Sequence, residues 1–142
     1  MSVSTVRNRI SLTLYSLCAL ALTGAGLRYL FATEIMPYHL DAMALTWQDL
    51  SPGMQVMTLN FMKSAGVGMF TSGVTVSLMI VFAIRKGLAT YASTMTVAIM
   101  LQTGLVGYFA YQVDKLTPAN PPFAALFSVA GLAVIAYYSV TR

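Results

Sequence analysis

The residues best suited to chemistry gather in one stretch of the sequence, from Glu34 to Gly53. This stretch holds three of the chain's four acidic residues and its only histidine, His39. Because an imidazole titrates near neutral pH, His39 is suited to accept a proton or to hydrogen-bond a ligand or an acid. The candidate ligand-binding residues within the stretch are Glu34, His39, Asp41, Trp47 and Asp49.

Metal binding has little support in the same stretch. Met36, His39 and Met43 follow an i, i+3, i+7 spacing, and two thioethers with an imidazole suit Cu(I). Pro37, however, interrupts the helix that this spacing assumes. Zinc would need a second His or Cys at ligand spacing, which the stretch lacks. We therefore predict no metal site, no cofactor and no catalytic residue, and we lean against an enzyme.

Two cations, Arg28 and Lys63, lie inside apolar segments and extend this candidate site. Lys63 precedes Arg85 by 22 residues, about 33 Å of helix, so it lies near the outer boundary of a bilayer if Arg85 marks the inner one. The 19 residues from Arg9 to Arg28, about 29 Å of helix, give the same depth for Arg28. Both cations either extend to the headgroups or turn inward to meet the acids or a polar headgroup. Asn60, one turn before Lys63, continues the polar stripe.

The amino-acid composition indicates that membrane-spanning helices position these residues. Only 8% of the 142 residues are charged, 58% are hydrophobic and the mean hydropathy is +0.74, whereas a soluble domain has about 25% charged residues. A bilayer core requires about 20 mostly apolar helical residues. Four segments qualify, and we predict a single domain, residues 1–142, with spans at about 10–33, 54–84, 88–111 and 123–140.

The distribution of charge predicts the orientation of these spans. If the spans alternate, one side holds the five cations Arg7, Arg9, Arg85, Lys86 and Arg142. The other side holds all four acids and one loop cation, Lys115. The positive-inside rule then places both termini in the cytoplasm and the protein in the inner (plasma) membrane. The net charge of +4 reflects this topology, so we predict no binding to nucleic acid.

The loops predict how the spans connect. Pro37 is expected to end the first helix, and Ser51-Pro52 is expected to begin the second span. Because Arg85 and Gly87 bound a very short connection, the second and third spans must be antiparallel neighbours. Residues 38–50 have apolar positions at helical spacing and predict a short amphipathic helix on the outer face. The predicted fold is an all-α membrane protein, an up-down four-helix transmembrane bundle with this helix as a surface anchor or as a lid over a site.

Small and polar residues within the spans predict their packing. Ser64, Gly68 and Ser72 recur every four residues, a pattern typical of close helix packing within a bundle or between subunits. Gln102, near the middle of the third span, predicts an interhelical hydrogen bond or a contact with substrate. No acid or histidine lies deep in a span, which argues against a proton-coupled pump.

The chain resembles the DoxX-like group of small four-span bacterial membrane proteins in its polar, proline-broken segment after the first span and in the small-residue stretch Lys63 to Gly73. The outer string Met36-Pro37-Tyr38-His39 with Trp47 also resembles that of uncharacterised bacterial proteins of this size. The resemblance extends over about residues 12–111. It implies a four-span fold and an accessory or unknown role, and it carries over no catalytic residue. Where that group has a Gly-Lys pair at the end of the first span, this chain has Leu27-Arg28.

The leading functional hypothesis is a non-catalytic membrane protein that binds an amphiphilic molecule, lipid or quinone-like, or a membrane partner at its outer face. Membrane lipids, a membrane protein partner or further copies of the chain are the expected partners. One alternative is a small oligomeric transporter or channel with a polar route along Gln102 and Thr103. Another is a membrane redox or enzyme subunit that uses His39.

Overall fold

The computed structural model describes residues 3–141, and it confirms the predicted all-α bundle. The elements in chain order are α1 (Val3–Leu30), α2 (Pro37–Met43), the 3-10 turn η1 (Trp47–Asp49), α3 (Pro52–Lys86), α4 (Leu88–Leu116) and α5 (Phe123–Thr141). Among the described residues, four of these helices (α1, α3, α4 and α5) are long and apolar enough to cross a membrane. The chain is therefore a multi-pass membrane protein.

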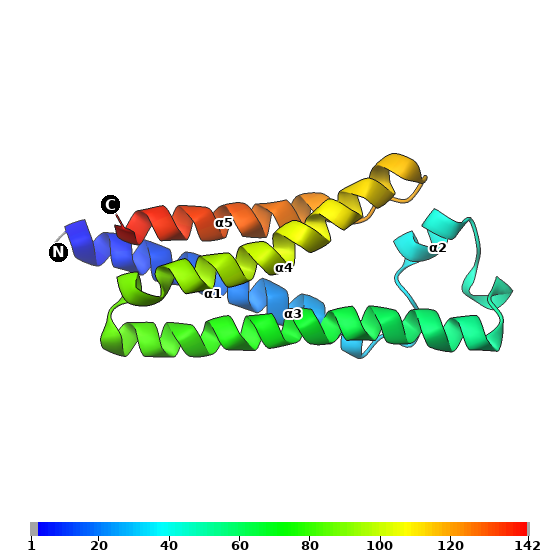
Figure 1. Cartoon of the computed structure of the whole chain (residues 1–142), viewed down its shortest axis with the longest axis horizontal. Helices are drawn as coiled ribbons and strands as arrows, with labels where there is room; N and C mark the ends of the chain where they lie inside the picture. Colours follow the sequence, from blue (N-terminus) through cyan, green and yellow to red (C-terminus); the bar gives the residue numbers. More distant parts are fainter. Residues whose placement is uncertain (1–2, 142) are drawn as a thin grey trace.

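The four long helices run alternately up and down (Figure 1). Both ends of the chain and the α3–α4 turn lie at one end of the bundle, here named the terminal end, and α2 lies at the other, the α2 end. The 35-residue α3 projects beyond α1 and α4 at the α2 end, and α4 diverges from it there (Figure 1).

The helix boundaries confirm one loop prediction and correct another. Ser51 precedes α3, its hydroxyl accepts a hydrogen bond from the Met54 N–H at 3.4 Å, and Pro52 lies in the first turn, as predicted. Pro37 does not end the first helix, because α1 already ends at Leu30. Pro37 instead lies in the first turn of α2, a position where proline's missing N–H has no helical partner to lose.

The outer amphipathic segment, 38–50, is also not one continuous helix. α2 ends at Met43, and Ala44 adopts a left-handed conformation with φ 52°. The η1 turn follows, and the Asp49 carboxylate accepts hydrogen bonds from the Thr46 N–H at 2.8 Å and from the Thr46 hydroxyl at 2.7 Å. Such local bonds from a side chain to the backbone compete with helix formation, which explains the break.

Glycines hold α1 and α3 together. A Cβ atom on Gly66 would lie 2.7 Å from the Tyr29 Cβ, and one on Gly73 would lie 2.7 Å from the Thr23 backbone nitrogen. With no hydrophobic effect between helices in lipid, such close approach supplies much of the attraction. The contact stripe of α3 is the buried series Met62, Gly66, Met69, Gly73, Val76, Ile80 and Ala83.

Two residues of the predicted stripe of Ser64, Gly68 and Ser72 pack between helices of the bundle. Gly68 and Ser72 face α4, where the Ser72 hydroxyl donates to Gln102 Oε1 at 3.4 Å. This bond confirms the interhelical role predicted for Gln102. Ser64 is exposed and donates to the carbonyl oxygen of Asn60 in its own helix.

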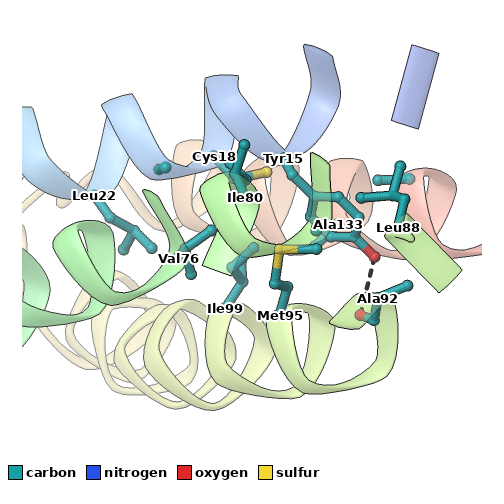
Figure 2. Close-up of a cluster of buried hydrophobic side chains, with 13 residues drawn as sticks. Tyr15, Cys18, Leu22, Val76, Ile80, Leu88, Ala92, Met95, Ile99 and Ala133 are labelled. Carbon is teal, nitrogen blue, oxygen red and sulfur yellow. Dashed lines mark hydrogen bonds between the residues drawn. The ribbon is translucent and has the colours of Figure 1, made fainter. Parts of the chain in front are cut away.

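The bundle is packed solidly toward the terminal end. Figure 2 shows the apolar cluster there, which includes Tyr15, Ile80, Met95 and Ile99. The Tyr15 side chain is fully buried, and its hydroxyl donates to the Ala92 carbonyl at 3.0 Å. This well-packed half contrasts with the α2 end, where the bundle contains a cavity.

Candidate ligand-binding site

A large cavity lies at the α2 end of the bundle, between α2 on one side and α3, α4 and the start of α5 on the others. Its volume is about 520 Å³, within the range of about 300–1,000 Å³ typical of small-molecule sites. None of the described side chains that line it carries a formal charge at neutral pH, and most are apolar or aromatic. The arrangement suits an apolar ligand with few polar atoms.

His39 supplies an unsatisfied polar group in this wall. Its side chain lines the cavity, and its Nε2 atom is buried with no hydrogen-bond partner. Burial lowers the pKa of His39 below its ordinary value, so the imidazole is neutral at neutral pH. Because a buried polar atom without a partner costs about 1–3 kcal/mol, a ligand atom that bonds Nε2 would recover part of that cost.

Two hydrogen-bonded tyrosines line the cavity beside His39. The hydroxyls of Tyr29, at the end of α1, and Tyr38, in α2, hydrogen-bond to each other. The Tyr38 and His39 rings lie 4.4 Å apart between centroids. Burial is the main reason that the pKa of Tyr38 is raised, the Tyr29 hydroxyl adds to the rise, and Arg28 acts in the opposite direction. The Tyr38 hydroxyl therefore remains protonated at neutral pH.

A smaller cavity of about 280 Å³ lies next to the first. The two share Tyr29 and Tyr38 in their walls, but Arg28 lines only the smaller one. Of the eight ligand-binding residues predicted from the sequence, His39 thus lines the larger cavity and Arg28 the smaller.

The predicted acidic residues line neither cavity. Glu34 and Asp41 are exposed. Asp49 is also exposed, and its hydrogen bonds from Thr46 lower the pKa of its carboxyl. Within residues 5–141 neither Arg28 nor Lys63 forms an ion pair with these acids. The cluster of paired charges considered from the sequence is therefore not formed.

The remaining predicted residues, Trp47, Asn60 and Lys63, lie outside both cavities. Trp47 packs against the small apolar core beneath η1, and its carbonyl accepts from Gln55 Nε2 at 2.8 Å. Asn60 is exposed and Lys63 is half-buried on α3. Neither lines either cavity. Within the described part of the chain, no three His, Cys, Asp or Glu side chains lie close enough to hold a metal ion.

Sequence reasoning missed the aromatic and aliphatic side chains that form most of the larger cavity. Tyr29, Tyr38, Phe61 and Phe109 come from four different helices and meet only in the fold. One signal was present, since Tyr38 stands beside His39 in the string Met36-Pro37-Tyr38-His39.

Comparison with protein-family models, with curated proteins and with solved structures finds no match to this chain. The resemblance to the DoxX-like group stays a prediction.

The lowered pKa of His39 predicts a pH-dependent stability. Below the ordinary histidine pKa of about 6.5, His39 takes up a proton in the unfolded chain but resists protonation in the folded protein. The free energy of unfolding therefore decreases as the pH is lowered. Between about pH 7.5 and 5.5, the Tm of the purified protein in detergent should fall more steeply than that of a His39→Phe variant. Equal slopes for the two proteins would contradict a folded-state pKa below the ordinary value.

Proposed function

We propose that this protein is a non-catalytic membrane protein that binds an amphiphilic ligand, lipid or quinone-like, in the larger cavity at its outer end. The observation that carries the proposal is a mostly apolar cavity whose lining includes His39, a side chain with a buried, unpartnered Nε2 atom. A ligand could supply the missing hydrogen-bond partner of His39 and place its apolar part against the apolar lining of the cavity.

The depth of the cavity supports a ligand that comes from the membrane. Along α3, Met69 lies about 24 Å from Arg85 and Thr58 lies about 40 Å from it, at 1.5 Å per residue. Both residues line the cavity. If Arg85 marks one edge of a hydrocarbon core about 30 Å thick, the cavity extends from the core to the headgroup layer. An amphiphile has its apolar and polar parts at those same depths.

The side chains at the cavity mouth support entry from the side. Phe61 of α3 and Phe109 of α4 line the cavity and are 67% and 64% exposed on the lipid-facing surface. A molecule dissolved in the bilayer therefore reaches the cavity between α3 and α4 without first crossing water.

The charge distribution supports the orientation in this proposal. Arg7, Arg9, Arg85 and Lys86 lie at the terminal end of the bundle, in or beside the ends of α1 and α3. For a protein of the inner (plasma) membrane, the positive-inside rule places that end in the cytoplasm and the α2 end on the outer side.

A substitution that fills the cavity tests the proposal. Ala65 is exposed on α3 and lines the cavity, so Ala65→Phe places a ring in the space without removing a packed side chain. Native mass spectrometry of the purified protein in lipid extract should show a bound amphiphile in wild type and at least about tenfold less in Ala65→Phe, equivalent to 1.4 kcal/mol.

Val67→Phe is the matched control, because Val67 is 51% exposed on the same helix and lines neither cavity. It should retain the bound molecule. An equal amount of amphiphile on wild type and Ala65→Phe, or none on wild type, would contradict the proposal.

A further inference from the structure

The hydrogen-bonding state of the cavity wall narrows the class of ligand. Within residues 5–141, His39 Nε2 is the only buried side-chain nitrogen or oxygen atom that has no partner. The Tyr29 and Tyr38 hydroxyls bond to each other. The Thr58 hydroxyl donates to the Met54 carbonyl of its own helix at 2.8 Å. Among the buried side-chain atoms of the described lining residues, His39 Nε2 thus has the one unmet hydrogen-bonding need.

The charge at the wall narrows the class further. An anionic headgroup buried beside His39 would meet a neutral imidazole and apolar side chains, and a charge taken out of water without a partner is strongly disfavoured. Among the described residues, Arg28 is the cation that lines the smaller cavity, and no cation lines the larger one. Nothing in the wall of the larger cavity compensates a phosphate.

We infer that the ligand of this site is an uncharged amphiphile, one hydroxyl or carbonyl oxygen of which bonds His39 Nε2 while its hydrocarbon part leaves between Phe61 and Phe109. This inference rests on the proposed function and specifies its ligand. A free oxygen of this kind is present on an uncharged glycerolipid and on an isoprenoid ring ketone, and both offer the same contact. Charged phospholipids are excluded from the site.

A pair of lipids that differ only in headgroup charge tests the inference. Dioleoylglycerol and dioleoylphosphatidylglycerol have the same chains, and decylubiquinone provides an uncharged ring ketone. The full chain in detergent micelles is mixed with equal amounts of each probe, and bound mass is read by native mass spectrometry, with the rise in Tm as a second readout. We expect at least about tenfold more binding of an uncharged probe than of the anionic lipid, a difference of 1.4 kcal/mol.

Two variants at His39 separate recognition from folding. His39→Phe keeps the ring and removes the polar atom, so it should bind the uncharged probes at least about tenfold more weakly while its Tm without ligand is unchanged or higher. His39→Gln keeps a hydrogen-bonding group and should retain more of the binding than His39→Phe. If His39→Phe fails to fold, His39→Leu removes the same polar atom with a smaller side chain and should lose binding, whereas His39→Gln and the Val67→Phe control should retain it.

The outcomes separate this inference from the proposed function. Whichever uncharged probe binds more tightly identifies the source of the oxygen. Equal or tighter binding of dioleoylphosphatidylglycerol overturns the uncharged class, and unchanged binding by His39→Phe overturns the role of Nε2. In both cases the proposed function would still hold if the wild type binds an amphiphile and Ala65→Phe does not. If no probe binds and no lipid copurifies, both proposals fail.

Discussion

Replacing Gly73 by alanine is expected to lower the free energy of unfolding by about 2–4 kcal/mol, at or above the usual cost of overpacking. The added Cβ would lie 2.7 Å from the Thr23 backbone nitrogen and 2.9 Å from the Ala19 carbonyl oxygen, and it would also clash with the Thr23 hydroxyl. Backbone atoms cannot rotate away as side chains do, so α1 and α3 must separate along the stripe that joins them. Thermal or SDS-induced unfolding in micelles, followed by circular dichroism, measures the change.

Gly104→Ala is the matched control for this prediction. Gly104 is also in the middle of a spanning helix, α4, but a Cβ there would meet no atom within 4 Å. Alanine at that position should leave stability unchanged or raise it by about 0.5 kcal/mol, through its better helix propensity. Equal destabilisation by the two alanines would show that helix propensity, rather than the α1–α3 contact, determines the effect.

Tyr15→Ala should destabilise the protein by about 3 kcal/mol, because it opens a cavity in the packed half of the bundle. Among the described residues Tyr15 is the largest fully buried side chain, and its hydroxyl bonds the Ala92 carbonyl of α4 (Figure 2). The same hydroxyl also hydrogen-bonds to the Thr96 hydroxyl at 2.7 Å. Tyr15→Phe keeps the ring and removes only the hydrogen bonds, so it should cost about 1 kcal/mol.

The same unfolding measurement separates packing from hydrogen bonding at this position. The loss in Tyr15→Phe should be small, since the Thr96 hydroxyl keeps the Ala133 carbonyl as an acceptor at 3.4 Å. A phenylalanine variant as unstable as the alanine variant would assign the stabilisation to the hydroxyl instead of the ring.

The fold was predictable from the sequence because a bilayer imposes simple limits. A hydrocarbon core about 30 Å thick requires long apolar helices, and the three-residue connection at Arg85–Gly87 requires antiparallel neighbours. The ends of the helices were less predictable. Proline is common both in the first turn of a helix and just after the end of one, so Pro37 fits either position. The hydrogen bonds between Asp49 and Thr46 interrupt a segment whose apolar spacing favours a helix.

The site was predictable only in part. His39 was selected because it is the only histidine, and an imidazole is suited to bind a ligand or to accept a proton. Glu34, Asp41 and Lys63 were selected for their charge, yet solvent or headgroups satisfy a charge near a boundary without any partner. The cavity itself depends on the divergence of α3 and α4 and on side chains such as Phe61 and Phe109, which in a sequence are indistinguishable from ordinary lipid-facing residues.

The unequal lengths of the helices have a consequence for how the protein sits in its membrane. The 35 residues of α3 extend about 52 Å and the 19 of α5 about 28 Å, at 1.5 Å per residue. A bilayer adapts to such mismatch by thinning on the short side and by tilting or thickening on the long side. The cavity lies along the long helix, so its depth relative to the headgroups changes with the thickness of the bilayer. If the cavity binds an amphiphile as proposed, the acyl-chain length of the surrounding lipids would affect how readily that ligand exchanges with the membrane.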